Sequence, residues 1–138
     1  MASFIYDSCP DDEARGNLDF DTNAFKAMLV TSSYVPNRAT HTKRSDVTSE
    51  ASGTGYTAGG TTTSVTVTKD VAEHKVSISF SSVSWPGVTL SAKGCVIYRA
   101  RGGASSADEL VAYVDFGSTI SATGATFAVS VSTITKQL

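Results

Sequence analysis

The stretch "HKVSISFSSVSW" (residues 74–85) alternates between apolar and polar side chains. Val76, Ile78 and Phe80 fall in one phase, and serine and lysine side chains fill the other. A period of two residues predicts a half-buried β-strand. The upstream segment "SVTVT" (residues 64–68) has the same period, and "KDVAEH" (residues 69–74) has the character of a connection. Together the two segments predict a β-hairpin.

Strand patterns recur along most of the chain. They cover residues 24–34, 89–100, 109–117 and 126–133. The apolar run "CVIY" (residues 95–98) predicts burial on both faces of its strand, with Leu90, Ala92, Gly94, Val96 and Tyr98 sharing one face. We expect a turn at "WPG" (residues 85–87), another around Gly124, and a flexible loop at residues 101–108.

One short helix is expected near the N-terminus. In "CPDDEARG" (residues 9–16), proline lies at the start, acidic residues follow in the first turn, and glycine lies at the end. The whole pattern predicts an all-β fold in one domain over residues 1–138. We expect an antiparallel sandwich or jelly roll of about six to eight strands, with at most this one short N-terminal helix.

Composition narrows the classes of function. The chain has 138 residues, a net charge of −2 and 17% charged residues, so no basic surface for nucleic acid is expected. No apolar run is long enough to span a bilayer, so no membrane partner is expected. The N-terminus lacks the pattern of a signal peptide, which predicts synthesis and folding in a cytoplasm. Cys9 and Cys95 match no metal spacing, and a disulfide between them is left open.

The glycine-rich segment "EASGTGYTAGGTTT" (residues 50–63) invites comparison with phosphate-binding loops. A P-loop requires a lysine directly after its last glycine and a helix beyond it. Here the next lysine is Lys69 and the following segment is strongly β. The glycines are therefore interpreted as permitting positive φ in a bent loop that presents Tyr56.

No pattern of catalytic residues emerges. There is no Gly-x-Ser-x-Gly motif, and the two histidines, His41 and His74, lie in no recognisable catalytic arrangement. The acidic N-terminal quarter lacks the spacing of an EF-hand calcium loop. We therefore expect a protein that is not an enzyme and that has no cofactor and no metal site.

Four segments carry a resemblance to a known family. They are "FKAMLVTSSYVP" (residues 25–36), "HTKRSDVTSEASGTGYTAGG" (41–60), "AKGCVIYRA" (92–100) and "ELVAYVDFG" (109–117). In this order they resemble a family of short structural virion proteins of tailed bacteriophages. The likeness extends from about residue 20 to residue 117, and its most specific part is the Gly-Tyr-Thr-Ala-Gly-Gly segment.

The resemblance implies a structural role in the virion. The leading expectation is a capsid cement or decoration protein that binds the outer surface of the head and stabilises contacts between capsomers. Its partner would be the major capsid protein, its oligomer a homodimer, and its place the capsid exterior after assembly in the bacterial host cytoplasm. One alternative is a receptor- or glycan-binding module of a tail fibre or baseplate, using Tyr34, Tyr56, Trp85 and Tyr98. A neck or head-completion protein is the other.

Three segments are the candidates for the partner interface. The apolar N-terminal segment is expected to dock either on its own core or on a partner. The long loop at residues 34–44 brings basic side chains that would meet an acidic capsid surface. The glycine segment would offer a tyrosine anchor. The residues concerned are Phe4, Ile5, Tyr6, Tyr34, Arg38, Lys43, Arg44 and Tyr56.

Overall fold

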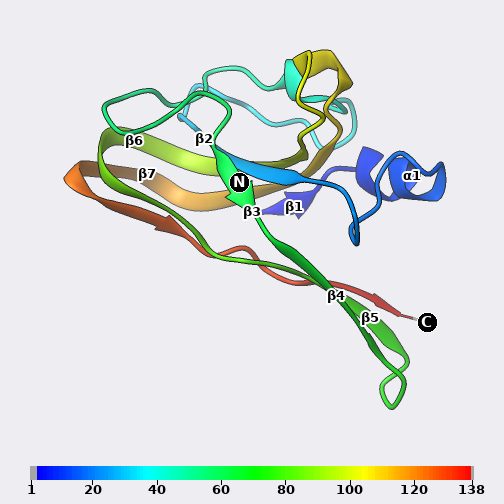
Figure 1. Ribbon diagram of the computed structural model, residues 1–138. Helices are drawn as coiled ribbons and strands as arrows, with labels where there is room; N and C mark the ends of the chain where they lie inside the picture. Colours follow the sequence, from blue (N-terminus) through cyan, green and yellow to red (C-terminus); the bar gives the residue numbers. More distant parts are fainter. Residues whose placement is uncertain (1–2, 138) are drawn as a thin grey trace.

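The computed structural model describes residues 3–137 and shows an all-β fold (Figure 1). Within these residues, two antiparallel sheets are accompanied by one α-helix, α1 (Ser8–Ala14), and two 3₁₀ turns, η1 (Arg44–Asp46) and η2 (Ser105–Ala107). The strands are β1 (Phe4–Ile5), β2 (Phe25–Val30), β3 (Thr61–Thr63), β4 (Val65–Asp70), β5 (Lys75–Phe80), β6 (Val83–Arg99), β7 (Leu110–Val129) and β8 (Ile134–Gln137). The expected sandwich, strand number and short N-terminal helix are confirmed.

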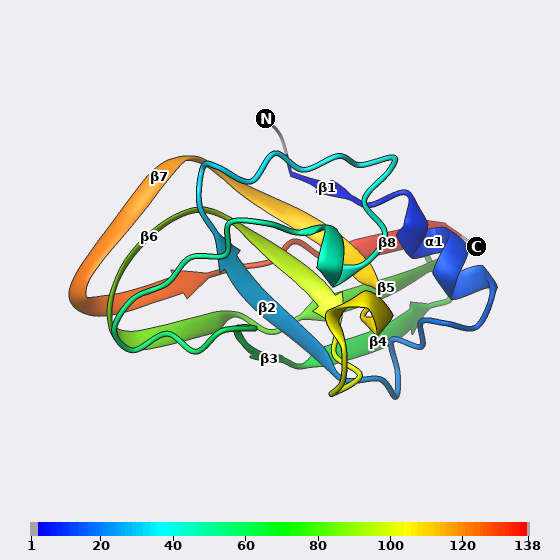
Figure 2. The same ribbon diagram turned by 90° about the horizontal axis from the view of Figure 1, so that it is seen from above.

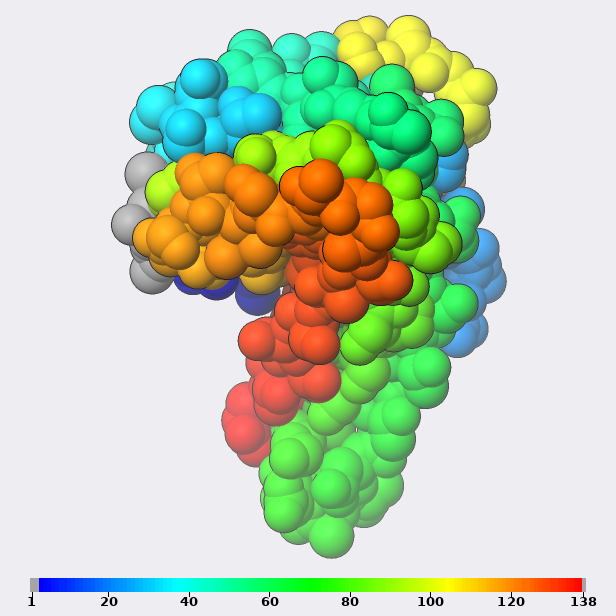
Figure 3. Space-filling model, turned by 90° about the vertical axis from the view of Figure 1, so that its left-hand side faces the viewer, coloured from blue at the N-terminus to red at the C-terminus, as the bar shows by residue number. Residues whose placement is uncertain are grey.

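The two sheets have no strand in common, but the chain alternates between them. The larger sheet has the order β1-β7-β6-β2-β3 and the smaller has the order β4-β5-β8. The chain passes between them three times, from β3 to β4, from β5 to β6 and from β7 to β8. The smaller sheet leaves the body as a projecting arm, here defined as β4, β5, β8 and the connecting turn at residues 71–74 (Figures 1 and 3).

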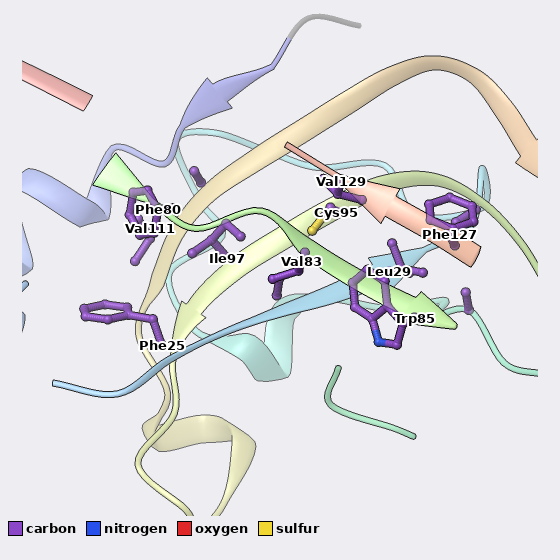
Figure 4. Close-up of a cluster of buried hydrophobic side chains, with 14 of the residues drawn as sticks. Phe25, Leu29, Phe80, Val83, Trp85, Cys95, Ile97, Val111, Phe127 and Val129 are labelled. Carbon is purple, nitrogen blue, oxygen red and sulfur yellow. The ribbon is translucent and has the colours of Figure 1, made fainter. Parts of the chain in front are cut away.

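The main core lies between the sheets and is built largely from the alternating positions (Figure 4). The aromatic side chains Phe25, Phe80, Trp85 and Phe127 are all buried in it, as the strand patterns predict. Cys9 and Cys95 are also buried there as free thiols, so the disulfide left open by the sequence is not formed. Burial raises the pKa of both thiols to about 12, which keeps them protonated and unreactive.

The predicted turns at "WPG" and around Gly124 are wrong. Strand β6 continues without interruption through residues 85–87, with a register shift between Trp85 and Val88 and a φ of 63° at Gly87. Strand β7 likewise continues through Gly124, whose φ is 58°. A glycine with positive φ inside a strand accommodates a β-bulge, so these signals mark bends within two long strands.

A second bulge changes which face of β6 is apolar. The sequence predicts that Leu90, Ala92, Gly94, Val96 and Tyr98 share one face. In the structure Leu90 and Ala92 belong to the core between the sheets, whereas Val96 and Tyr98 belong to a cluster on the opposite face. The pairing with β7 shifts between Ala92 and Gly94, where two steps along β6 face the five steps from Ile120 to Asp115 along β7. The alternation of β6 inverts across this irregularity. Strand β6 therefore supplies side chains to two cores.

Candidate functional site

Residues 31–60 form a layer of loops over the outer face of the larger sheet, on the side opposite to the arm (Figures 1 and 2). We call this layer the cap. It contains a single 3₁₀ turn, η1, and connects β2 to β3. Three isolated β-bridges fasten it to the sheet: Val30 with Glu50, Lys43 with Glu109, and Thr54 with Thr89. A loop of this length is thereby held at several points rather than only at its ends.

A second apolar cluster lies beneath the cap. Its members come from β2, β6, β7, the N-terminal segment and the cap itself: Tyr6, Met28, Val30, Tyr34, Val96, Tyr98, Leu110 and Tyr113. All of them are buried. Because the larger sheet is covered on both faces, its central strands are apolar in both phases, which is why "CVIY" contains no polar residue.

Glu50 anchors the glycine segment from within. Its Oε2 atom accepts a hydrogen bond from the Tyr56 hydroxyl at 2.6 Å and another from the Gly59 amide at 2.7 Å. The Leu29 amide donates to the same tyrosine oxygen at 3.0 Å. Burial, together with the bond to Glu50, raises the pKa of Tyr56 above its ordinary value. The expectation that the loop presents Tyr56 is therefore wrong, because the ring points inward and braces the cap.

Replacing Tyr56 with phenylalanine tests this bracing. The variant keeps the ring but leaves the Leu29 amide and the Glu50 carboxylate without their common partner. We expect the free energy of unfolding to fall by about 1 kcal/mol, as is usual when a partly buried hydrogen-bonded hydroxyl is removed. Urea unfolding of the two proteins measures the change. An unaltered free energy would mean that Tyr56 does not brace the cap.

Tyr6 and Tyr34 also lie inside the molecule. Their relative exposures are 0% and 4%, and their hydroxyls are 2.8 Å apart. The Tyr34 hydroxyl also lies 2.9 Å from Nδ1 of His41, which joins the long loop to the network. Burial raises the pKa of both tyrosines. Neither ring has surface for a partner, which corrects the expectation that they are contact residues.

The apolar N-terminal segment docks on its own core. Strand β1 pairs with β7, placing Phe4 opposite Tyr113 and Ile5 opposite Ala112. The Phe4 ring packs edge-on against Tyr6, with 5.1 Å between the ring centroids. Of the two alternatives for this segment, docking on its own core is therefore observed. Phe4 and Ile5 remain half-buried, so part of each side chain is still accessible.

The basic side chains of the long loop are engaged within the chain. Arg38 pairs with Asp7 at 2.9 Å on the exposed surface. The other two pairs involve nearly buried carboxylates: Lys43 with Glu109 at 3.5 Å, and Arg44 with Asp108 at 2.7 Å. The Arg44 guanidinium also lies over the Tyr98 ring. The pairs of Lys43 and Arg44 hold the cap to the residues directly before β7. Any partner surface would have to compete with these existing partners for the three charges.

What the cap exposes is small and nearly uncharged. The exposed cap residues are Ser32, Ser33, Val35, Asn37, Arg38, Ala39, Thr40, Ser45, Thr48, Ser49, Ser52, Gly53, Thr54, Gly55, Thr57 and Ala58. Only Arg38 carries a charge, and Val35 is 69% exposed. The cores of protein interfaces are likewise depleted of charge. The sequence signal was present in residues 47–60, which hold a single charged residue, Glu50.

The aromatic residues proposed for glycan binding do not form a platform. Tyr34, Trp85 and Tyr98 are each at most 5% exposed, and Tyr56 is half-buried with its hydroxyl bonded inside the cap. Sugar recognition by ring stacking requires an exposed face. The glycan alternative thus loses three of the four residues on which it was based, and the fourth, Tyr56, keeps only part of its surface.

Within residues 3–137 no cluster of histidine, cysteine, aspartate and glutamate is arranged to hold a metal ion. The same part of the chain contains no helix with the length and apolar character needed to cross a membrane. Comparisons with protein-family models, with curated proteins and with solved structures found no match to this chain, so the resemblance to tailed-bacteriophage virion proteins stays a prediction from the sequence.

Proposed function

We propose that this protein is a structural component of a tailed-bacteriophage virion, a cement or decoration protein that binds the major capsid protein on the outer surface of the head. The observation that carries the proposal is the outer face of the cap. Its exposed residues are mostly small, only Arg38 among them is charged, and Val35 is 69% exposed. Few charges would have to lose their hydration when such a face meets another protein surface.

The bracing of the cap supports the same role. Three bridges, the Glu50 anchor and the buried carboxylates beneath the basic residues all hold the loops in one conformation. A preordered surface loses little conformational entropy on binding, so more of the contact energy remains as affinity. A protein that binds only the assembled shell stabilises that shell by mass action.

Particles that lack the protein test the proposal directly. We expect them to lose DNA or break at a lower temperature than complete particles, and to recover when purified protein is added back. Copy number is the second readout, because a cement protein is present at many equivalent capsomer contacts whereas a neck protein occupies one vertex. Equal heat resistance with and without the protein, or occupancy at a single vertex, would overturn the proposal.

A charge placed on the cap should block particle binding. We expect Val35→Glu to lower occupancy on particles at least about tenfold, since a buried unpaired carboxylate at an interface costs more than 1.4 kcal/mol. The matched control is Val71→Glu at the tip of the arm, because Val71 is 66% exposed against 69% for Val35. The cap is excluded as the binding face if both variants bind as the unmodified protein does.

A further inference from the structure

The arm ends on one side in an unpaired strand edge. Strand β4 is the outer strand of the smaller sheet and pairs only with β5, from Val65 opposite Phe80 to Asp70 opposite Lys75. The ladder has no register shift along this length. Among the residues that the structure describes, no segment pairs with the other side of β4. Figure 3 shows this sheet (green and red) extending well away from the body.

The backbone groups that face the free edge can be identified. The Ser64 carbonyl accepts a hydrogen bond from the Ser81 amide at 2.8 Å, so the backbone of Ser64 faces the β5 side. Facing alternates along an antiparallel strand. Thr66 and Thr68 therefore bond to β5, whereas the amide and carbonyl groups of Val65, Val67 and Lys69 point outward.

This edge lacks most of the features that keep strand edges from pairing. It contains no proline and no bulge, and the side chains of residues 66–69 are exposed, with Val67 39% exposed. Natural edges are usually shortened, bulged or covered, and a regular edge rich in β-branched residues is a ready template for another strand. Lys69 and the terminal Asp70 are the only charged residues of β4.

We propose that β4 pairs with β4 of a second copy of this chain, antiparallel and about a two-fold axis at Val67. A two-fold axis perpendicular to the sheet keeps the apolar faces of the two arms on the same side. Such an axis passes midway between one residue and the same residue of the partner, which lie directly opposite each other. Centred on Val67, the register sets Val67 opposite the partner's Val67 and Val65 opposite the partner's Lys69. Every outward amide and carbonyl of Val65, Val67 and Lys69 then has a partner.

Neighbouring registers satisfy fewer of these groups. An axis at Thr66 pairs Val65 with Val67 but sets Lys69 opposite Thr63, which is already paired with Phe25 in the larger sheet. An axis at Thr68 leaves Val65 opposite the turn at the arm tip. Since an unpaired backbone group at a dry interface is costly, the register at Val67 is favoured.

The side chains agree with this register. The face that carries Val65 and Val67 gains a valine pair at the axis and two contacts between Val65 and the alkyl stem of Lys69. The opposite face gains Thr66 beside the partner's Thr68 at two symmetric positions. Pairs of β-branched residues and threonine pairs are among the favourable cross-strand neighbours. The edge is thus complementary to itself, which an isologous dimer requires.

Charge also fits a second copy. The apolar face of the arm forms one wall of a groove, where Val67, Val76 and Ile78 lie across from the segment that follows α1. Asp19 and Asp21, both exposed, line the same groove. In the proposed dimer the partner's Lys69 enters on this face, next to Val65. Its charge then lies on the face of the sheet that Asp19 and Asp21 cover, where the other cation of the groove, Lys136, is already paired with Glu13.

Cysteine cross-linking of the purified protein tests the register. In the dimer the two copies of residue 67 lie directly opposite, about 5.5 Å apart at Cα, within the range that a disulfide spans. Two copies of residue 71 lie more than about 25 Å apart along the ladder. We expect Val67→Cys to form a covalent dimer in an oxidising glutathione buffer, at least tenfold faster than Val71→Cys. The native Cys9 and Cys95 are buried in both variants.

A second variant tests the backbone pairing. Val67→Pro removes an outward amide and leaves the bonds of Thr66 and Thr68 to β5 in place. Val67→Thr is the control, because it keeps the amide and the branched shape. Light scattering should show a dimer for the unmodified protein and for Val67→Thr, and at least a tenfold higher dissociation constant for Val67→Pro with an unchanged circular dichroism spectrum.

A monomeric unmodified protein at tens of micromolar would overturn the inference. So would equal cross-linking at positions 67 and 71, or a Val67→Pro variant that dimerises normally. These measurements use no virion, so they stand or fall independently of the proposed capsid role.

Discussion

Gly60→Ala is expected to cost more stability than any other single methyl group added to the cap. The φ of Gly60 is 82°, and a Cβ atom built there would lie 1.8 Å from the Ala27 carbonyl oxygen and 2.7 Å from the Met28 Cα atom. Strand β2 cannot retreat, because it is paired with β6 on one side and β3 on the other. We expect a loss of more than about 4 kcal/mol of unfolding free energy, measured by urea unfolding, or failure to fold.

Substitutions at two other glycines distinguish the cost of the steric clash from the cost of the strained backbone. Gly102 has a φ of 83° but open space around its Cα, so Gly102→Ala should cost only about 1–2 kcal/mol. Gly103 has open space and no left-handed φ, so Gly103→Ala should change stability by less than about 0.5 kcal/mol. The close approach of the cap to β2 would be refuted if Gly60→Ala cost no more than Gly102→Ala.

The strands could be predicted where apolar and polar side chains alternate regularly along the sequence. Val76, Ile78 and Phe80 lie in the phase expected, and Phe25 and Leu29 are buried as their spacing indicates. This success has a local cause, since one polar face and one apolar face leave a visible period of two.

Bulges were not predictable, because their causes lie elsewhere in the chain. Gly94 is required where the Tyr113 ring crosses β6: a Cβ atom there would lie 2.5 Å from the ring. Nothing in the neighbourhood of Gly94 announces that contact. The same holds for "WPG". Proline and glycine are found both in turns and at bends within strands, and only the pairing of β6 with β7 on both sides of this segment identifies it as a bend.

The direction of the cap's side chains was also hidden from the sequence. Tyrosines beside loops are common contact residues, and only the position of Glu50 shows that Tyr56 points inward. For the basic residues the partners lie far along the chain, as with Lys43 and Glu109. What the sequence did show was the scarcity of charge in residues 47–60, which corresponds to the exposed surface.

Glu109 joins the cap to the sheet through a cluster of charged side chains. The contribution of this cluster to the free energy of unfolding should depend on pH. Its side chain is 3% exposed and accepts hydrogen bonds from Nε and Nη2 of Arg101 at 2.9 and 2.8 Å, with Lys43 at 3.5 Å. Burial alone would raise the pKa of Glu109. The bonds from Arg101 and the charge of Lys43 outweigh burial and lower the pKa below its ordinary value of 4.5.

We therefore expect Glu109→Gln to lower the free energy of unfolding by about 2 kcal/mol at neutral pH. Breaking a fully buried pair costs about 3–5 kcal/mol, and the smaller figure reflects the partial exposure of Arg101 and Lys43. A carboxylate whose pKa is lower in the folded state stabilises the fold above its unfolded pKa. That contribution is lost as the pH falls through the folded pKa. The difference between the two proteins should therefore shrink below pH 4.5.

Urea unfolding across this pH range measures the effect, with Asp7→Asn as the matched control. Asp7 pairs with Arg38 at 2.9 Å, but both side chains are more than half exposed, at 54% and 62%. That substitution should change stability by less than about 0.5 kcal/mol at any pH. A constant difference between Glu109→Gln and the unmodified protein down to low pH would show that Glu109 acts through packing rather than charge. If instead the difference closes with acid, the ion pairs beneath the cap hold it to β7, and acid should loosen the cap before the core between the sheets unfolds.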